Sequence, residues 1–84
     1  MTPKIKTLKT TKEYELIIEY EDGTMRLMDF KKMFDMNMFL SLKEEEVFKT
    51  AHISFDTVEW NNGIDIDPED LFEESKQVNK SKIA

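Results

Sequence analysis

The chain contains only two glycines, and each follows an Asp or Asn after a stretch of alternating apolar residues. Asp22-Gly23 comes after YELIIEY (14–20), and Asn62-Gly63 comes after Val58 and Trp60. Asp-Gly and Asn-Gly pairs favour β-hairpins, because tight turns need residues that adopt a positive φ at little steric cost. The sequence therefore predicts two antiparallel hairpins.

For the first hairpin we predict a two-residue type I′ turn at Asp22-Gly23. This register places Ile18 opposite Leu27. It also places Glu19 opposite Arg26, so that apolar residues face each other and the cation faces an acid. A shift of one residue would move every side chain to the other face of the sheet, and burial therefore favours this pairing.

For the second hairpin we predict a three-residue loop whose glycine is in the left-handed conformation. This loop pairs Trp60 with Ile64. It also pairs Val58 with Ile66, so that apolar residues share one face. A two-residue turn would instead pair Trp60 with Asp65 and mix apolar with charged residues. Burial favours the longer loop.

The stretch HISF (52–55) also alternates polar and apolar residues, which predicts a further strand. Ile53 and Phe55 would then face the core. The next inward residue is Val58, which changes the phase of the alternation. A turn or bulge is therefore expected at Asp56-Thr57.

Three segments have the features of short helices, and each begins with a residue that caps helices well. They are FKKMF (30–34) after Asp29, residues 42–49 after Ser41 in the capping-box pattern Ser41-x-x-Glu44, and the segment from Pro68 to Val78 after Asp67, with Leu71, Phe72, Ser75 and Val78 on one face. Apolar residues recur in them at helical spacing, which places them on one face. Proline suits the first position of a helix, because its missing N–H has no partner there.

Strands and helices in this order predict an α+β fold, a small single domain with antiparallel β-hairpins packed with two or three short helices. A chain of 84 residues is expected to form one domain. We assign residues 1–78 to it, with PKIKTLKT (3–10) as an edge strand because of its lysines. Residues 79–84 hold nothing to pack and are predicted to be a disordered tail.

Charge is distributed unevenly along the chain, whose net charge is −6. Residues 1–12 carry four lysines (+4), residues 13–75 carry five cations and all 18 acids (5 − 18 = −13), and the last nine residues carry three lysines (+3). An acidic body repels phosphate backbones, which argues against direct nucleic-acid binding. The chain lacks an apolar span and the apolar core of a signal peptide, so we expect a cytoplasmic protein without membrane contact.

Residues that usually carry catalysis are scarce. His52 is the only histidine, cysteine is absent, and both glycines are assigned to turns, which leaves none for a phosphate-binding loop. His52 alternates with Ile53 and should point away from the core. The serines have no partner that the sequence suggests. We therefore expect no catalytic residue, no cofactor and no enzymatic activity.

Carboxylates are concentrated in IDIDPEDLFEE (64–74). Asp65 and Asp67 lie two residues apart on extended chain and share a face, and Asp70 lies about one turn further on. Oxygen ligands of this kind suit Mg²⁺ or Ca²⁺, although the spacing differs from that of a calcium-binding loop. In a structural interpretation, Asp67 caps the helix and Asp70 stabilises its first turn. Only Asp65 then has no local role.

Large apolar residues leave two interpretations open. Trp60 is either a core residue or a partner contact, since Trp is enriched at the centres of protein interfaces. The methionines before residue 40 either fill the core or form an adaptable binding surface. On the second interpretation the candidate partner contacts are Trp60, Asp65, Met33, Met36 and Met38.

Four segments resemble, in sequence and spacing, members of the small bacterial family of unknown function DUF2442. They are PKIKTLKT, YELIIEYEDGTMRLMDF, FLSLKEEEVF and VEWNNGIDIDPEDLFEES, within roughly residues 2–75. The positions that match the family outline are Gly23, Arg26, Asp29, Leu42, Phe48, Trp60, Gly63, Asp65, Ile66, Asp67, Pro68, Glu69 and Leu71. Phe72 stands where the family often has Tyr, and Met33-Phe34 where it often has a Leu pair.

The resemblance implies a compact α+β domain with no established catalytic residues. It also implies that the gene of this chain lies beside a gene of another small uncharacterised family. The two products have been suggested to behave like toxin and antitoxin. Our leading hypothesis is a non-enzymatic protein-interaction module that binds a small basic protein, the product of the neighbouring gene. Three alternatives stay open: a transcriptional regulator with lysine-rich ends that contact nucleic acid, a weak Mg²⁺- or Ca²⁺-binding protein at Asp65, Asp67 and Asp70, and a homodimer.

Overall fold

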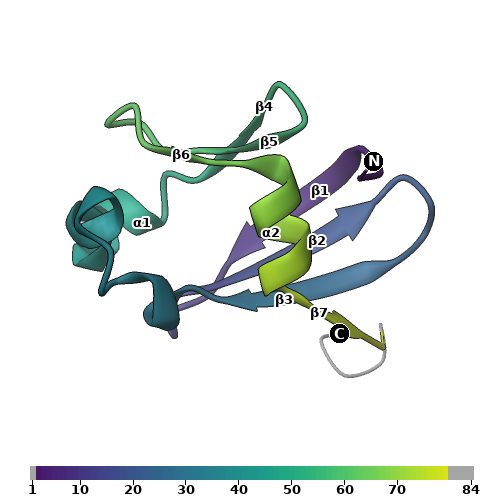
Figure 1. The fold of residues 1–84 in the computed structure, drawn as a ribbon, viewed down its shortest axis with the longest axis horizontal. Helices are drawn as coiled ribbons and strands as arrows, with labels where there is room; N and C mark the ends of the chain where they lie inside the picture. The colour runs from purple at the N-terminus through teal and green to yellow at the C-terminus, as the bar shows by residue number, and fades with distance from the viewer. Residues whose placement is uncertain (1, 80–84) are drawn as a thin grey trace.

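The computed structural model describes residues 2–79, and within them the chain forms two antiparallel sheets and short helices (Figure 1). In chain order the elements are β1 (Ile5–Thr10), β2 (Glu15–Tyr20), β3 (Met25–Asp29), the 3₁₀ helices η1 (Phe30–Met33) and η2 (Asn37–Lys43), α1 (Glu45–Phe48), β4 (His52–Ser54), β5 (Thr57–Glu59), β6 (Asp65–Ile66), α2 (Pro68–Glu74) and β7 (Lys76–Val78). The α+β fold is therefore confirmed.

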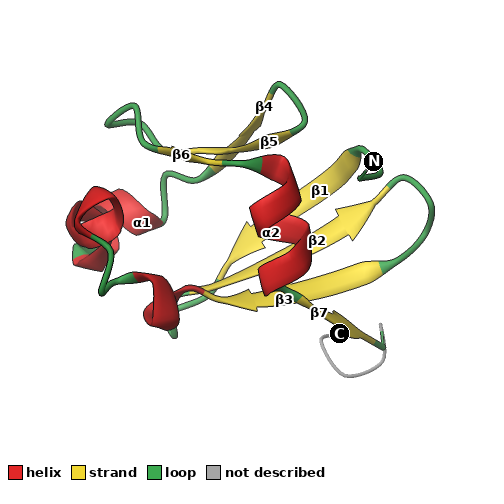
Figure 2. Cartoon of the chain, viewed as in Figure 1, coloured by secondary structure: helices red, strands yellow, loops and turns green. Residues whose placement is uncertain are grey.

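The four-stranded sheet has the order β1-β2-β3-β7, and the three-stranded sheet has the order β4-β5-β6. Helix α2 runs from the small sheet to the large one (Figure 2). The predicted edge strand, β1, does lie at an edge and pairs only with β2 within the described part of the chain.

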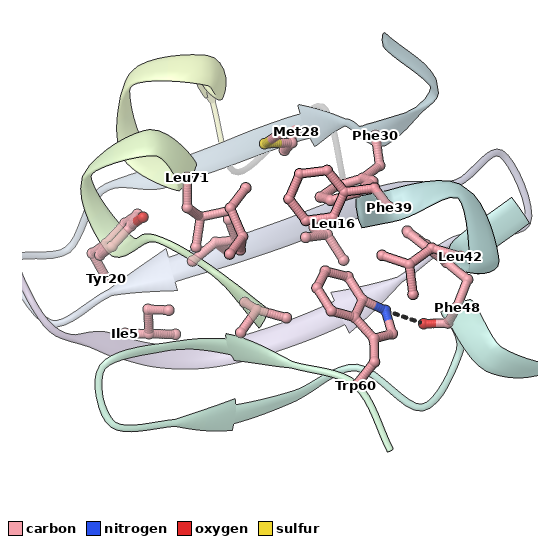
Figure 3. Packing of buried hydrophobic residues seen from close by; sticks show 13 residues of the cluster. Ile5, Leu16, Tyr20, Met28, Phe30, Phe39, Leu42, Phe48, Trp60 and Leu71 are labelled. Carbon is pink, nitrogen blue, oxygen red and sulfur yellow. Dashed lines mark hydrogen bonds between the residues drawn. The ribbon is translucent and has the colours of Figure 1, made fainter. Parts of the chain in front are cut away.

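One core fills the space between the two sheets and the helices (Figure 3). Its buried residues are Ile5, Leu16, Ile18, Tyr20, Met28, Phe30, Phe39, Leu42, Phe48, Val58, Trp60, Ile66 and Leu71. Trp60 is 1% exposed, and its indole N–H donates to the Phe48 carbonyl at 3.0 Å, which satisfies the indole donor inside the core. The Phe30 ring packs edge-on against Trp60, with the ring centroids 5.2 Å apart.

Both Asx-Gly segments form the same three-residue loop. The Trp60 N–H donates to the Ile64 carbonyl at 2.8 Å, and the Gly63 N–H donates to the Trp60 carbonyl at 3.0 Å. This loop and the pairing of Val58 with Ile66 confirm the predicted second hairpin.

The two-residue turn predicted at Asp22-Gly23 is wrong. The Tyr20 N–H donates to the Thr24 carbonyl at 2.9 Å, so residues 21–23 form the loop and the register moves by one residue. Gly23 is the loop residue with a positive φ. Asp22, for which the type I′ turn also requires a positive φ, does not have one, and its side chain accepts the Thr24 N–H at 2.9 Å.

The shifted register changes which residues of β3 face the core. Met28 pairs with Leu16 and is fully buried, and Arg26 pairs with Ile18 instead of Glu19. The Arg26 guanidinium lies 4.1 Å from the centre of the Phe72 ring. It also donates to the Ser75 hydroxyl and carbonyl, each at 2.7 Å. A charge on the core side of the sheet is therefore satisfied at the C-terminal end of α2, where the helix dipole favours a cation.

The predicted caps have different outcomes. Asp29 accepts the Lys31 N–H at 3.0 Å, and Asp67 accepts the Glu69 N–H at 2.9 Å, which confirms both. The capping box at Ser41 and the continuous helix over 42–49 are wrong. The chain is extended at Glu44, with φ −73° and ψ 114°, between η2 and α1. Burial of Phe39 and Leu42, three residues apart, favours the tighter 3₁₀ turn before it.

The end of the described chain also differs from the prediction. Helix α2 ends at Glu74, and Val78, predicted on the helical face, lies in β7, where it pairs with Met25. In β7 the backbone pairs with β3, which extends the large sheet by one strand. The predicted disordered tail, residues 79–84, lies outside the described residues except for Asn79.

The β4–β5 hairpin turns one residue earlier than predicted. Ser54 pairs with Thr57, which leaves Phe55-Asp56 as the two-residue turn, both with positive φ (48° and 69°). Phe55 is 98% exposed, so its predicted inward orientation is wrong, and Ile53 retains 40% exposure. Within the described residues no helix has the length and apolar character needed to cross a membrane.

Candidate protein-interaction surface

Four of the five candidate contact residues line one hollow on the surface. The hollow has a volume of about 360 Å³ and is lined by Met33, Met36, Met38, Phe39, Thr57, Asp65, Ile66, Asp67, Pro68 and Asp70. We call it the Met–Asp hollow. The fifth candidate, Trp60, is 1% exposed and belongs to the core, so it takes no part in this surface.

One side of the hollow is apolar and comes from the segment between β3 and α1. Met33 ends η1, Met36 precedes η2, and Met38 lies within η2. Phe39 and Leu42 hold η2 in the core, which turns Met36 and Met38 outward with 47% and 53% exposure. Burial of two residues of η2 therefore exposes the methionines next to them.

The other side of the hollow is acidic and comes from β6 and the first turn of α2. Asp65 is the residue of β6 that faces away from the core, since its neighbour Ile66 is buried. Asp67 uses its carboxylate to accept the N–H groups of Glu69 and Asp70, at 2.9 and 3.4 Å. This cap fixes the start of α2 and holds Asp70 at the rim of the hollow.

Asp65 and Asp70 are the acids of the hollow that are available to a partner. Both are exposed, and neither side chain has a hydrogen bond or ion pair to another residue within 2–79. Their charges are not engaged elsewhere in the described part of the chain. Within the same residues, no three His, Cys, Asp or Glu side chains come close enough together to hold a metal ion.

His52 is occupied by local contacts on β4. Its Nδ1 lies 3.0 Å from the Thr50 carbonyl, and its Nε2 lies 3.5 Å from a Glu59 carboxylate oxygen on the paired strand. Strand pairing accounts for the Glu59 contact, because His52 and Glu59 are direct cross-strand partners, and the Thr50 contact is local, two residues back along the chain.

The surroundings of Tyr20, Asp22 and Lys49 shift the pKa values of these side chains. Burial raises the pKa of the Tyr20 hydroxyl. Hydrogen bonds from Thr24 lower the pKa of the Asp22 carboxyl, and the Glu46 carboxylate raises the pKa of Lys49. Each shift follows from burial or from a neighbour on the same element or loop.

Sequence reasoning missed three other exposed apolar residues of the described chain, one of which is Ile53, predicted to face the core but 40% exposed. Leu40 is 50% exposed on η2, and Phe55 is 98% exposed at the tip of the β4–β5 hairpin. A signal for Phe55 was available, because Phe55-Asp56 gives an alternative two-residue turn that keeps Val58 inward. The strict alternation of HISF pointed instead to a longer strand.

Comparison with known proteins gives one family match. The model of the family described as "Protein of unknown function (DUF2442)" matches residues 5–77 of the chain. No curated protein and no solved structure matches.

Proposed function

The chain belongs to the DUF2442 family, proteins of unknown function, and we propose that it is a non-enzymatic protein-interaction module. In this proposal the Met–Asp hollow takes a segment of a partner protein that carries both basic and apolar residues. The observation that supports it most is that Met33, Met36 and Met38 share one hollow with Asp65 and Asp70. We place the protein in the bacterial cytoplasm and assign it no catalytic residue and no cofactor.

The methionines supply an apolar and adaptable contact. Met side chains are unbranched and flexible, so they fit apolar groups of different shapes. Met36 and Met38 are about half exposed, and withdrawing both from water contributes roughly 2 kcal/mol. This is too little for stable binding by itself, so the surrounding charges must contribute.

The acids select a basic partner. Asp65 and Asp70 stand at the hollow, and residues 13–75 together carry a charge of 5 − 18 = −13. A field of this sign accelerates the approach of a basic protein and slows that of an acidic one. Binding should therefore weaken as salt increases. The small product of the neighbouring gene, which the family resemblance implies, is the partner that we propose, in an antitoxin-like pairing.

The nucleic-acid alternative has less support. Strand β1 presents Lys6 and Lys9 at a sheet edge, but the Lys6 ammonium already lies 4.0 Å from a Glu19 carboxylate oxygen. A gel-shift assay at low salt should show no retarded DNA or RNA. A retarded band that Lys9→Ala weakens would favour this alternative over the protein partner.

The first experiment tests the chemistry of the hollow with a defined probe. An acetylated, amidated helical peptide of Leu and Lys is titrated into protein with ¹³C-labelled Met methyl groups. The methyl signals of Met33, Met36 and Met38 should shift. Met25, on the large sheet, and Met28, in the core, are internal controls that should not shift. An equivalent Leu and Glu peptide should leave all signals unchanged.

The second experiment tests the partner. The tagged chain is co-expressed with the neighbouring gene product, and the complex is measured by calorimetry after copurification. Met36→Ser with Met38→Ser, and Asp65→Asn with Asp70→Asn, should each weaken binding at least tenfold. Glu45→Gln with Glu73→Gln removes the same two charges at exposed positions outside the hollow and should have a smaller effect. Absence of copurification, together with unchanged toxicity on co-expression, would refute the proposal.

A further inference from the structure

The large sheet has a second face, opposite the core. Side chains alternate along a strand, so the burial of Leu16, Ile18 and Met28 places their neighbours on the other side. The strand pairing brings four apolar residues together there, since Ile17 pairs with Leu27 and Met25 pairs with Val78. We call this surface the outer sheet face; its central residues are Ile17, Met25, Leu27 and Val78.

The outer sheet face is apolar at its centre and incompletely covered in the structure of residues 2–79. All four central residues are partly exposed, and none of them belongs to the core cluster or packs against it. On the inner face, Leu16, Ile18 and Met28 are fully buried. The sheet therefore presents a continuous apolar strip across β2, β3 and β7.

The charges around this strip balance. Lys9 pairs with Ile17, Lys76 pairs with Leu27, and the Lys6 ammonium lies within 4.0 Å of a Glu19 carboxylate oxygen, which gives three cations. The alternation along β2 and β3 places three acids on the same face, namely Glu15, Glu19 and Asp29. Lys32 and Glu74, which lie 3.1 Å apart beside Leu27, add one charge of each sign. The face thus has a charge of 4 − 4 = 0, whereas the chain has a net charge of −6.

We propose that the outer sheet face binds a second copy of this chain. A symmetric dimer places one patch against itself, so the patch must be complementary to itself. The Met–Asp hollow fails this condition, because two acidic hollows repel each other. The outer sheet face meets it, because it is neutral and carries both signs of charge around an apolar centre.

The positions of the charges also indicate how the two copies meet. The cations Lys9 and Lys76 lie on the edge strands β1 and β7, and the acids Glu15 and Glu19 lie towards opposite ends of β2. A two-fold axis that lies in the plane of the face, diagonal to the strands, relates the two copies. The strands of one copy then cross those of the other at about 90°, as in orthogonal sheet packing. Each edge then lies over the strand ends of the other copy. Of the two possible diagonals, the proposal takes the one that brings Lys76 of one copy to Glu19 of the other and Lys9 to the end that holds Glu15 and Asp29.

The size of the face predicts a weak dimer. Four strands spaced about 4.8 Å apart and about five residues long give a face of roughly 15 by 16 Å. This area, about 250 Å², is well below the ~800 Å² per partner of a standard protein interface. We therefore expect a dissociation constant between about 0.1 and 1 mM.

Sedimentation equilibrium of the purified chain tests the proposal. Protein concentrations from roughly 10 µM to 2 mM bracket the expected dissociation constant. The wild type should shift from monomer towards dimer over this range. Ile17→Thr with Leu27→Thr should keep the chain monomeric, because Thr retains strand propensity and removes apolar surface. Met36→Thr with Met38→Thr is the matched control in the hollow and should dimerise like the wild type. Circular dichroism confirms that each variant is folded.

A charge exchange tests the orientation. Lys76→Glu alone and Glu19→Lys alone each place like charges opposite each other and should weaken the dimer several-fold. A mixture of these two variants restores opposite charges at both contacts and should form the mixed dimer. A wild type that is monomeric at 2 mM would overturn the proposal. So would a dimer that survives Ile17→Thr with Leu27→Thr, or one that is lost only in the hollow variant.

Discussion

Phe55 is predicted to lower the stability of the chain, and replacing it with Asn should stabilise the fold. Phe55 and Asp56 form a two-residue turn with φ of 48° and 69°. Left-handed backbone costs an ordinary L-residue roughly 1–2 kcal/mol, whereas Asn adopts it more readily. At 98% exposure the Phe55 ring contributes almost no packing that would offset this cost.

The expected gain for Phe55→Asn is about 0.5–1 kcal/mol, since Asn recovers only part of the strain. In a domain of this size such a gain raises the melting temperature by about 2–8 °C. Thermal and urea unfolding followed by circular dichroism measure both quantities. An unchanged urea m-value shows that the change acts on stability and not on the compactness of the unfolded state.

Two further substitutions make this test specific. Phe55→Ala removes the ring and keeps a strained residue, so stability should change little. Tyr14 also has a positive φ, 60°, but its hydroxyl donates to the Lys43 carbonyl at 2.6 Å and its ring packs edge-on against Phe34 and Phe48. Tyr14→Asn should therefore destabilise the chain by about 2–3 kcal/mol. A neutral or destabilising Phe55→Asn would refute the reasoning, because it would mean that the ring packs or that the turn is unstrained.

Three further predictions concern single interactions. Arg26→Leu should destabilise the fold by about 1–3 kcal/mol in urea unfolding, because it removes two hydrogen bonds to Ser75; Arg26→Lys, which keeps the charge, should lose less. Trp60→Phe should cost about 1–3 kcal/mol, because it removes the indole donor to the Phe48 carbonyl, which keeps only the Ala51 N–H, and leaves a gap in the core; a stability equal to wild type would contradict this role. The pKa of Asp22 is lower in the folded chain than in the unfolded one, so its contribution is present above about pH 4 and is lost as the pH falls through the folded-state pKa. Asp22→Asn keeps the side-chain acceptor for the loop but cannot titrate, so the free energy of unfolding should depend less on pH below about pH 4. Urea unfolding at several pH values measures this, and an unchanged dependence on pH would rule out Asp22 as its source.

The Phe55 prediction bears on function as well as stability. A bulky, fully exposed residue in a strained turn has a cost within the chain and no internal contact to balance it. Strain of this kind is often retained at binding sites. If Phe55→Asn stabilises the chain and also weakens binding to the neighbouring gene product, the hairpin tip is a second contact beside the Met–Asp hollow.

Several local features of this protein follow from the order of its residues alone. The caps at Asp29 and Asp67 and the three-residue loop before Ile64 are confirmed, because each depends on neighbouring residues and on intrinsic backbone preferences. The α+β class follows from the same patterns. The candidate residues Met36 and Asp65 were also identified from the sequence, by residue type.

The register of the first hairpin and the composition of the surfaces depend on how the whole chain packs. Both possible loops at Asp22-Gly23 satisfy the turn, and burial of Met28 against the rest of the core selects the longer one. The same selection turns Arg26 inward and places Leu27 on the outer sheet face. Met36 and Asp65 are 29 residues apart in the chain (65 − 36 = 29), and they share a hollow only because the core packs η2 against β6 and α2. Contacts over such distances depend on the collective packing of the domain, which local sequence patterns do not encode.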